Sequence, residues 1–139
     1  MFDGLKAAVK DLDVGILVNN VGIAYEHAEY FHLVDSTKIQ QIIQVNVKAT
    51  TLLSYLVLPY MVERKRGCIV NVGSISSLVS EPLYAVYSGS KGYINNFSEA
   101  LHHEYKKYNI SVQAQLPGLV VNNSSVNLFL FTCLYRLLN

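Results

Sequence analysis

The chain is poor in the residues that mark disulfide-rich, metal-binding and nucleic-acid-binding proteins. Its two cysteines, Cys68 and Cys133, make neither a metal-ligand spacing nor a disulfide framework, and they are compatible with a reducing compartment. A net charge of +1 gives no reason to expect nucleic acid as a partner. No histidine has an acidic or cysteine neighbour at ligand spacing, so we expect no metal and place four histidines on the surface: His27, His32, His102 and His103.

Long apolar runs, internal repeats and low-complexity linkers are also absent. No run reaches the roughly 18 consecutive apolar residues of a membrane-spanning helix, and segment 1–13 has no signal-peptide core. Taken as given, the chain is therefore expected to be soluble. Its 139 residues, 51% apolar and 15% charged, exclude a disordered chain and suit one domain with a well-buried core.

The spacing of apolar residues predicts helices and strands in alternation. The expected elements are, in chain order, a helix end at 2–12, a buried strand at 14–18, a long helix from 35, a buried strand at 68–72, a helix at 84–108 and a strand at 111–116. Asp35 or Ser36 should cap the first long helix, and Pro59 should bend or end its regular part. The basic run before Gly67 is explained by a helix C-terminus rather than by binding.

This order predicts an α/β fold with a parallel sheet and right-handed crossovers. If the three strands lie side by side in sequence order, both long crossover helices must cover the same face. Only segment 2–10 is then available for the other face, and both edges lack a partner strand. We therefore expect a partial doubly wound sheet, the second half of a Rossmann-type domain whose first half is missing.

Three residues between positions 73 and 91 form a candidate catalytic group. Ser74 follows the second strand, and Tyr87 and Lys91 lie one turn apart on the following helix. An adjacent ammonium favours the phenolate form of tyrosine, so the pair can act as an acid near neutral pH. Taken alone, however, a Tyr four residues before a Lys is more often an ordinary surface pair.

Other short motifs follow in one order along the chain. Asn19, Asn20 and Gly22 come after the first strand, Asn46 lies within the first long helix, and Pro117 with Gly118 follows the third strand. Each has a plain alternative, because such turns are common and a mid-helix Asn is usually solvated. Together with Ser74, Tyr87 and Lys91 they resemble the short-chain dehydrogenase/reductase family, over residues 2–123.

Within that family, the chain resembles the branch of 17-beta-hydroxysteroid dehydrogenases and very-long-chain 3-oxoacyl-CoA reductases. The residues that carry this likeness are Val21, the run 25–31 and the run 58–64. The resemblance implies a carbonyl reductase of lipid metabolism, acting in fatty acid elongation on a 3-oxoacyl-CoA or in steroid metabolism on a keto-steroid. It also implies NADP as cofactor, with NAD left open.

The resemblance also implies a role for each motif residue. Tyr87 would protonate the substrate carbonyl, Ser74 would hydrogen-bond the same oxygen, and Lys91 would lower the pKa of Tyr87 and hold the nicotinamide ribose. Asn46 would hold a water that links Lys91 to solvent. The remaining cofactor contacts would come from four residues at the strand ends: Asn19, Gly22, Pro117 and Val120.

Three departures from the family pattern limit what it implies. None of the eight glycines forms a pair spaced for the family's phosphate-binding loop. Asn122 stands where the family usually has threonine. Residues 124–139 form a divergent apolar tail, so we divide the chain into a partial domain at 1–123 and this tail.

These departures leave a second hypothesis open. The chain could be a catalytically inactive truncated isoform, or a gene-model fragment, that acts only by pairing with full-length subunits. The family's long helices imply a homo-oligomer in either case. The resemblance implies the endoplasmic reticulum, whereas a chain complete as given would be cytosolic. We expect the tail to fold back on the uncovered sheet as a helix or strand, or the chain to associate.

Overall fold

The computed structural model describes residues 2–10, 12–118 and 134–135. Predictions for Val120, Asn122, Cys133 and most of the tail lie outside these residues. The main elements are α1 (Phe2–Val9), β1 (Ile16–Asn19), α2 (Ser36–Ile42), the π-helix η2 (Ile43–Ala49), α3 (Thr50–Arg64), β2 (Gly67–Val72), α4 (Ala85–Tyr105), β3 (Ile110–Leu116) and β4 (Leu134–Tyr135). Short 3-10 turns are η1 (Phe31–Leu33), η3 (Ile75–Ser77) and η4 (Lys106–Tyr108).

The described strands form one sheet in the order β1-β2-β3-β4. The first three are parallel, with Asn19 opposite Asn71 and Asn71 opposite Ala114, as the alternation of strands and helices predicted. β4 pairs antiparallel with the edge of β3, where Leu134 lies opposite Leu116. This part of the tail therefore returns to the sheet as a strand, at its edge rather than on its face.

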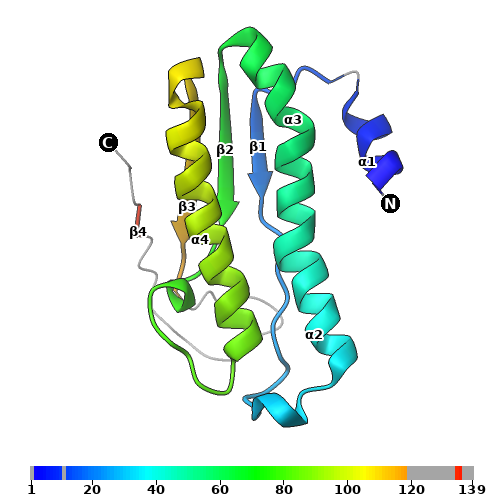
Figure 1. The fold of residues 1–139 in the computed structure, drawn as a ribbon, viewed down its shortest axis with the longest axis vertical. Coiled ribbons are helices and arrows are strands. Elements are labelled where there is room, and N and C mark those ends of the chain that lie inside the picture. The colour runs from blue at the N-terminus through cyan, green and yellow to red at the C-terminus, as the bar shows by residue number, and fades with distance from the viewer. Residues whose placement is uncertain (1, 11, 119–133, 136–139) are drawn as a thin grey trace.

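Both long helices lie on one face of the sheet, in front of the strands in Figure 1. The core between these layers is formed by residues from α3, β2, α4 and β3: Val57, Leu58, Met61, Ile69, Leu101, Ile110 and Val112. On β1, Leu17 and Asn19 point toward the helices, while Ile16 and Val18 are 66% and 56% exposed. The prediction of a buried first strand was therefore wrong, because the described residues place no layer over the second face there.

The first long helix continues through Pro59 to Arg64. Pro59 is exposed, so water can reach the carbonyl that a proline leaves without an intrahelical partner. Asp35 caps the start, since its Oδ1 accepts the Thr37 N–H at 3.1 Å. The left-handed residue at the end is Lys65, with φ 52°, rather than a glycine. Gly67 instead begins β2.

One helical stretch, Ser36–Arg64, is long and apolar enough to cross a membrane, with a mean hydropathy of 1.3 in its most apolar window. The same stretch packs against β1 and β2 and buries polar side chains at Asn46, Thr50 and Ser54. These contacts are those of a core helix that covers a sheet. α1 contacts the same stretch at α3, on the side away from β1 (Figure 1).

Candidate active site

The carboxyl ends of β1, β2 and β3 bring the predicted site residues to one edge of the sheet. Gly73 follows β2, and its N–H donates to the carbonyl of Gln115 on β3 at 2.7 Å. Two residues further along, the Ile75 N–H donates to the carbonyl of Pro117 at 3.1 Å. Ser74 and Pro117 are thus held side by side where the strands end, the usual location of ligand sites in open parallel sheets.

Gly73 leaves little room for a side chain at this contact, so a larger residue would have to displace the end of Leu116. A Cβ built there would lie 2.7 Å from Cδ2 of Leu116 and 3.4 Å from the Gln115 carbonyl. Ser74 then turns the chain into η3, where its Oγ accepts the Ser76 N–H at 3.2 Å. Ser74 is 8% exposed, so its hydroxyl has a fixed position at the site.

Tyr87 and Lys91 lie on adjacent turns of α4 and face the same end of the sheet. The Lys91 Nζ is 5.8 Å from the centroid of the Tyr87 ring. Lys91 is 5% exposed, and its Nζ donates to the carbonyl of Val72 at 3.1 Å. Because this ammonium is buried and bonded to the strand end, Lys91 belongs to the site and is not a surface lysine.

The pKa values of this pair differ from the expectation of a lowered tyrosine pKa. Burial raises the pKa of Tyr87 above 10.0; a hydrogen-bond interaction with Ser74 opposes this rise, and the negative charge of Glu81 adds to it. Burial also lowers the pKa of Lys91 below 10.5. The prediction of a lowered Tyr87 pKa was therefore wrong for this chain, because desolvation of the phenol exceeds any effect of the ammonium.

Asn46 is not the solvated residue that its mid-helix position suggested. It lies in η2, is 1% exposed, and exchanges two hydrogen bonds with the backbone of Ile23, at 2.8 and 2.9 Å. Its Nδ2 also donates to Ser90 Oγ at 2.9 Å, and Ser90 donates to the carbonyl of Tyr87 at 2.6 Å. Asn46 therefore connects the loop after β1 to the helix turn that carries Tyr87.

Gly22 lies directly against Lys91 and Asn46. A Cβ at Gly22 would be 3.0 Å from the Lys91 Nζ and 3.7 Å from Asn46 Oδ1. A side chain there would occupy the space beside the ammonium. The structure thus brings together five predicted residues in addition to Pro117: Gly22, Asn46, Ser74, Tyr87 and Lys91.

Asn19, predicted to contact a cofactor, points its side chain into the protein. Its Nδ2 donates to Asn71 Oδ1 at 2.8 Å and lies 3.2 Å from Ser54 Oγ. Asn71 in turn donates to Ser98 Oγ at 2.9 Å. The sequence analysis did not predict that Ser54, Asn71 and Ser98 form this buried network. The available signal was that each is a polar residue within an otherwise apolar pattern. A cofactor contact by the backbone of Asn19 stays a prediction.

Among the residues that the structure describes, no three His, Cys, Asp or Glu side chains are close enough to hold a metal ion. Three of the histidines are exposed as expected: His27, His32 and His103. His102 is half-buried, with both ring nitrogens covered, so the surface prediction was wrong for this residue.

The sequence model of the family described as short chain dehydrogenase matches residues 1–129. The chain belongs to this family. Among curated proteins, it is 42% identical over 123 residues to the very-long-chain 3-oxoacyl-CoA reductase of Mus musculus, covering 86% of this chain and 39% of that protein. It is 43% identical over 130 residues to the inactive hydroxysteroid dehydrogenase-like protein 1 of Homo sapiens, covering 93% and 39%.

Solved structures of short-chain dehydrogenases share this fold. A short-chain dehydrogenase from Sphingobium yanoikuyae in complex with NADPH superposes with a TM-score of 0.80 at 29% identity, covering 86% of this chain and 46% of that one. The Rossmann-type class predicted from the sequence is thereby confirmed. The chain spans about 39% of the length of the curated relatives described here.

Proposed function

We propose that this chain carries the catalytic half of a carbonyl reductase in which Tyr87 is the general acid. The observation that carries this proposal is the placement of Ser74, Tyr87 and Lys91 at the end of β2 with Asn46 behind them. Because the pKa of Tyr87 is raised above 10.0, its phenol holds a proton at neutral pH, as a general acid must.

Each residue contributes a separate part of the reaction. Tyr87 gives its proton to the carbonyl oxygen as negative charge develops there, and the Ser74 hydroxyl stabilises the same oxygen with a hydrogen bond. Lys91 is the cation nearest the phenol ring and replaces part of the lost solvation after the proton leaves. Asn46 fixes the backbone of the turn that carries Tyr87, through Ser90, and orients a water that returns protons to Lys91.

The residues present fit the ribose end of a nicotinamide cofactor, which supplies the hydride when it is bound. The support is the pair of Lys91 and Gly22, because the missing Cβ of Gly22 leaves space directly beside the ammonium. Lys91 would bind the ribose hydroxyls there, and Pro117 with Val120 would line the nicotinamide side. We propose NADP over NAD because of the branch that the chain resembles.

The substrate class follows from the same branch. A 3-oxoacyl-CoA is favoured over a keto-steroid because the mouse relative, at 42% identity, is named as a reductase of that substrate. This assignment places the protein in lipid metabolism and fatty acid elongation at the endoplasmic reticulum. If no full-length protein that carries this segment reduces a carbonyl, the second hypothesis, a catalytically inactive isoform, is favoured instead.

The test is Tyr87→Phe in a full-length enzyme that carries this segment. We expect reduction to fall by at least about 10²–10⁴-fold, the usual value of general acid catalysis, while the circular dichroism spectrum stays unchanged. Tyr30→Phe is the matched control, since Tyr30 precedes η1, lies outside the site and is 65% exposed. Full activity in Tyr87→Phe would refute the assignment.

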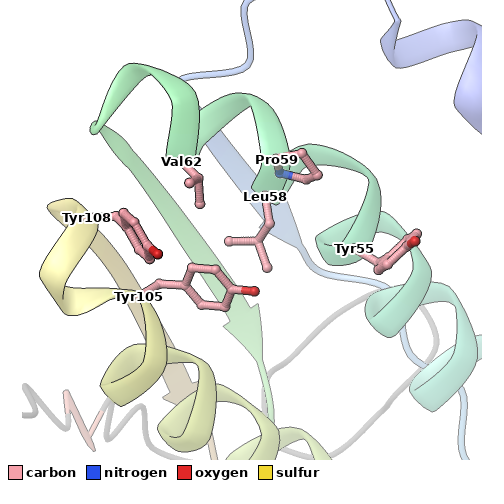
Figure 2. A pocket seen from close by; sticks show the side chains of 6 residues that line it. All are labelled: Tyr55, Leu58, Pro59, Val62, Tyr105 and Tyr108. Atoms are coloured by element: carbon pink, nitrogen blue, oxygen red, sulfur yellow. The ribbon is translucent and has the colours of Figure 1, made fainter.

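We propose further that two copies associate through α3 and α4. These helices enclose a hollow of about 260 Å³ on their outer side, lined by aromatic and apolar residues: Tyr55, Leu58, Pro59, Val62, Tyr105 and Tyr108. Figure 2 shows Tyr105 and Tyr108 facing Leu58 and Val62 across it. Light scattering should find a dimer that Tyr55→Asp weakens; a monomer at the same concentration would exclude this surface.

A further inference from the structure

The first turn of α4, which carries Tyr87, has no side-chain cap of its own. Tyr84, the residue directly before the helix, makes no side-chain hydrogen bond to this turn. The first N–H groups of a helix have no partner within the helix, and the side chain before it normally accepts one from the second or third helical residue. The position of this turn therefore depends on other segments of the chain.

Tyr25, in the loop after β1, supplies the acceptor that is missing. Its Oη accepts the N–H of Val86, the second residue of α4 and the neighbour of Tyr87, at 3.2 Å. The Tyr25 ring also stacks on the ring of Tyr84, with 5.5 Å between the centroids and 19° between the planes. One half-buried side chain thus holds both the residue before α4 and the second residue of the helix.

The backbone just before α4 is strained and is held by the same loop. Leu83 has a φ of 69°, in the left-handed region that a branched side chain rarely adopts. It is 37% exposed, so burial of its own side chain contributes little to holding this conformation. The carbonyl of Leu83 accepts the N–H of Glu29, four residues after Tyr25, at 3.1 Å. The loop after β1 therefore fixes the chain on both sides of the helix start.

The beginning of this loop contacts the site independently of Tyr25. Gly22 lies against the Lys91 Nζ, and Ile23 exchanges two hydrogen bonds with Asn46. The loop and the start of α4 both lie at the end of the molecule toward which β1 and β2 point (Figure 1). Because Asn46 already fixes Ile23, loss of the Tyr25 hydroxyl should leave the space beside the Lys91 ammonium unchanged.

We propose that Tyr25 is a positioning residue for carbonyl reduction. By accepting the Val86 N–H, its hydroxyl fixes the first turn of α4 and thereby the direction in which Tyr87 presents its phenol to the carbonyl. Water could also accept this N–H, but water does not connect the turn to another segment. The inference rests on the proposed role of Tyr87 as the general acid, because Tyr25 contributes to the reaction only through Tyr87.

The first test measures the hydrogen bond itself by amide hydrogen exchange in the 139-residue chain. The Val86 amide should exchange about 2- to 10-fold faster in Tyr25→Phe than in the unmodified chain, which corresponds to the usual net strength of one hydrogen bond. Tyr30→Phe is the matched control, because Tyr30 belongs to the same loop and is 65% exposed. Unchanged exchange of Val86 in Tyr25→Phe would overturn the proposal.

The second test measures reduction in a full-length enzyme that carries this segment. Tyr25→Phe keeps the stacked ring, so we expect kcat to fall by about 10- to 100-fold, the effect of a misdirected catalytic group, while the dissociation constant of NADPH changes by less than about twofold. Tyr30→Phe should leave both values unchanged. A role that is merely structural would instead weaken cofactor binding together with kcat, and that result would overturn the proposal.

A double variant shows whether Tyr25 acts through Tyr87. When Tyr87 is already replaced by phenylalanine, Tyr25→Phe should lower the residual rate no further, because no phenol is left to direct. A further loss as large as that in the single variant would show that Tyr25 acts elsewhere.

The outcomes separate this inference from the proposed function. Full activity in Tyr87→Phe refutes the general acid and the role of Tyr25 with it. Loss of activity in Tyr87→Phe with an unimpaired kcat in Tyr25→Phe overturns the role of Tyr25 alone. A fall in kcat that Tyr25→Phe causes only while Tyr87 is intact is the result we expect.

Discussion

The side-chain amide of Asn19 donates a hydrogen bond of 2.8 Å to the side-chain amide of Asn71 on the neighbouring strand. The two residues are opposite each other in the β1–β2 register and are 3% and 0% exposed. From Asn71 the chain of bonds continues to Ser98 on α4, which is 1% exposed and bonded to the carbonyl of Ile94 at 2.6 Å. Buried polar side chains thus fix α4 against both strands, about two turns from Lys91.

We expect that interrupting this network lowers the free energy of unfolding. Ser98→Ala leaves the Asn71 amide donor buried without its partner, so we expect the free energy of unfolding to fall by about 1–3 kcal/mol in urea titrations. Ser80→Ala is the control, since Ser80 is exposed and should change the value by less than about 0.5 kcal/mol. Equal stability of the two variants would show that the network is not energetically important.

Gly22 and Gly89 should respond oppositely to alanine. Gly89→Ala adds a methyl group in open space within α4 and should stabilise the chain by about 0.5–1 kcal/mol. Gly22→Ala forces the Lys91 Nζ to move and should weaken cofactor binding and reduction in a full-length enzyme, with little change in melting temperature. Unimpaired reduction in Gly22→Ala would place Lys91 elsewhere during the reaction.

Gly67 and Met61 form a coupled pair at the junction of α3 and β2. A Cβ at Gly67 would lie 2.4 Å from Met61 Sδ and 2.9 Å from Met61 Cβ. Gly67→Ala should therefore cost about 1–3 kcal/mol by overpacking. In a double-mutant cycle with Met61→Ala, the double variant should be more stable than the sum of the single changes predicts. Strict additivity would show that the two residues do not clash.

The two pKa shifts predict a particular dependence of stability on pH. The raised pKa of Tyr87 means that above pH 10.0 the folded chain keeps a proton that the unfolded chain loses, so the unfolding free energy falls. The lowered pKa of Lys91 acts oppositely, raising the unfolding free energy as pH climbs toward 10.5. Urea titrations from pH 8 to 12 should therefore show a smaller alkaline loss in Tyr87→Phe than in the unmodified chain. Parallel curves would exclude a raised Tyr87 pKa.

The 139-residue chain should not bind NADPH with micromolar affinity. Its described site residues offer one cation, Lys91, and no glycine pair in the sequence is spaced for a pyrophosphate loop. Titration of NADPH fluorescence measures this directly, with Lys91→Met as the control for any weak binding. Saturable micromolar binding that Lys91→Met abolishes would mean that this half-site alone is sufficient.

Much of the fold could be predicted because the patterns are local. The turn residues 19–22 and 117–118 predicted where two strands end. The spacing of apolar residues predicted the long helices. The spacing of Tyr87 and Lys91 also placed both on one helix face. Periodicity does not show which hydrogen-bond partner a buried polar side chain has, because that partner can lie far away in the chain.

Some differences follow from that limit. The burial of Asn46, for which a solvated position was the plain alternative, depends on a contact with Ile23 that a helix pattern does not show. The lowered pKa of Tyr87 was inferred from Lys91 alone, whereas burial and Glu81 depend on the loop between them. Pro59 was expected to bend or end the regular helix, but its exposed position allows the helix to continue.

The π-helix η2 contains the one wide turn that lets Asn46 face the site while α3 keeps its apolar side on the sheet. A π-turn holds one residue more than an α-turn, so deleting a single residue between Ile43 and Ala49 could leave an unbroken α-helix. Every residue before the deletion would then be rotated by about 100° relative to α3. Such a protein would keep its helix content and lose the link from Asn46 to Ser90, so the site depends on the length of this segment as well as on the asparagine within it.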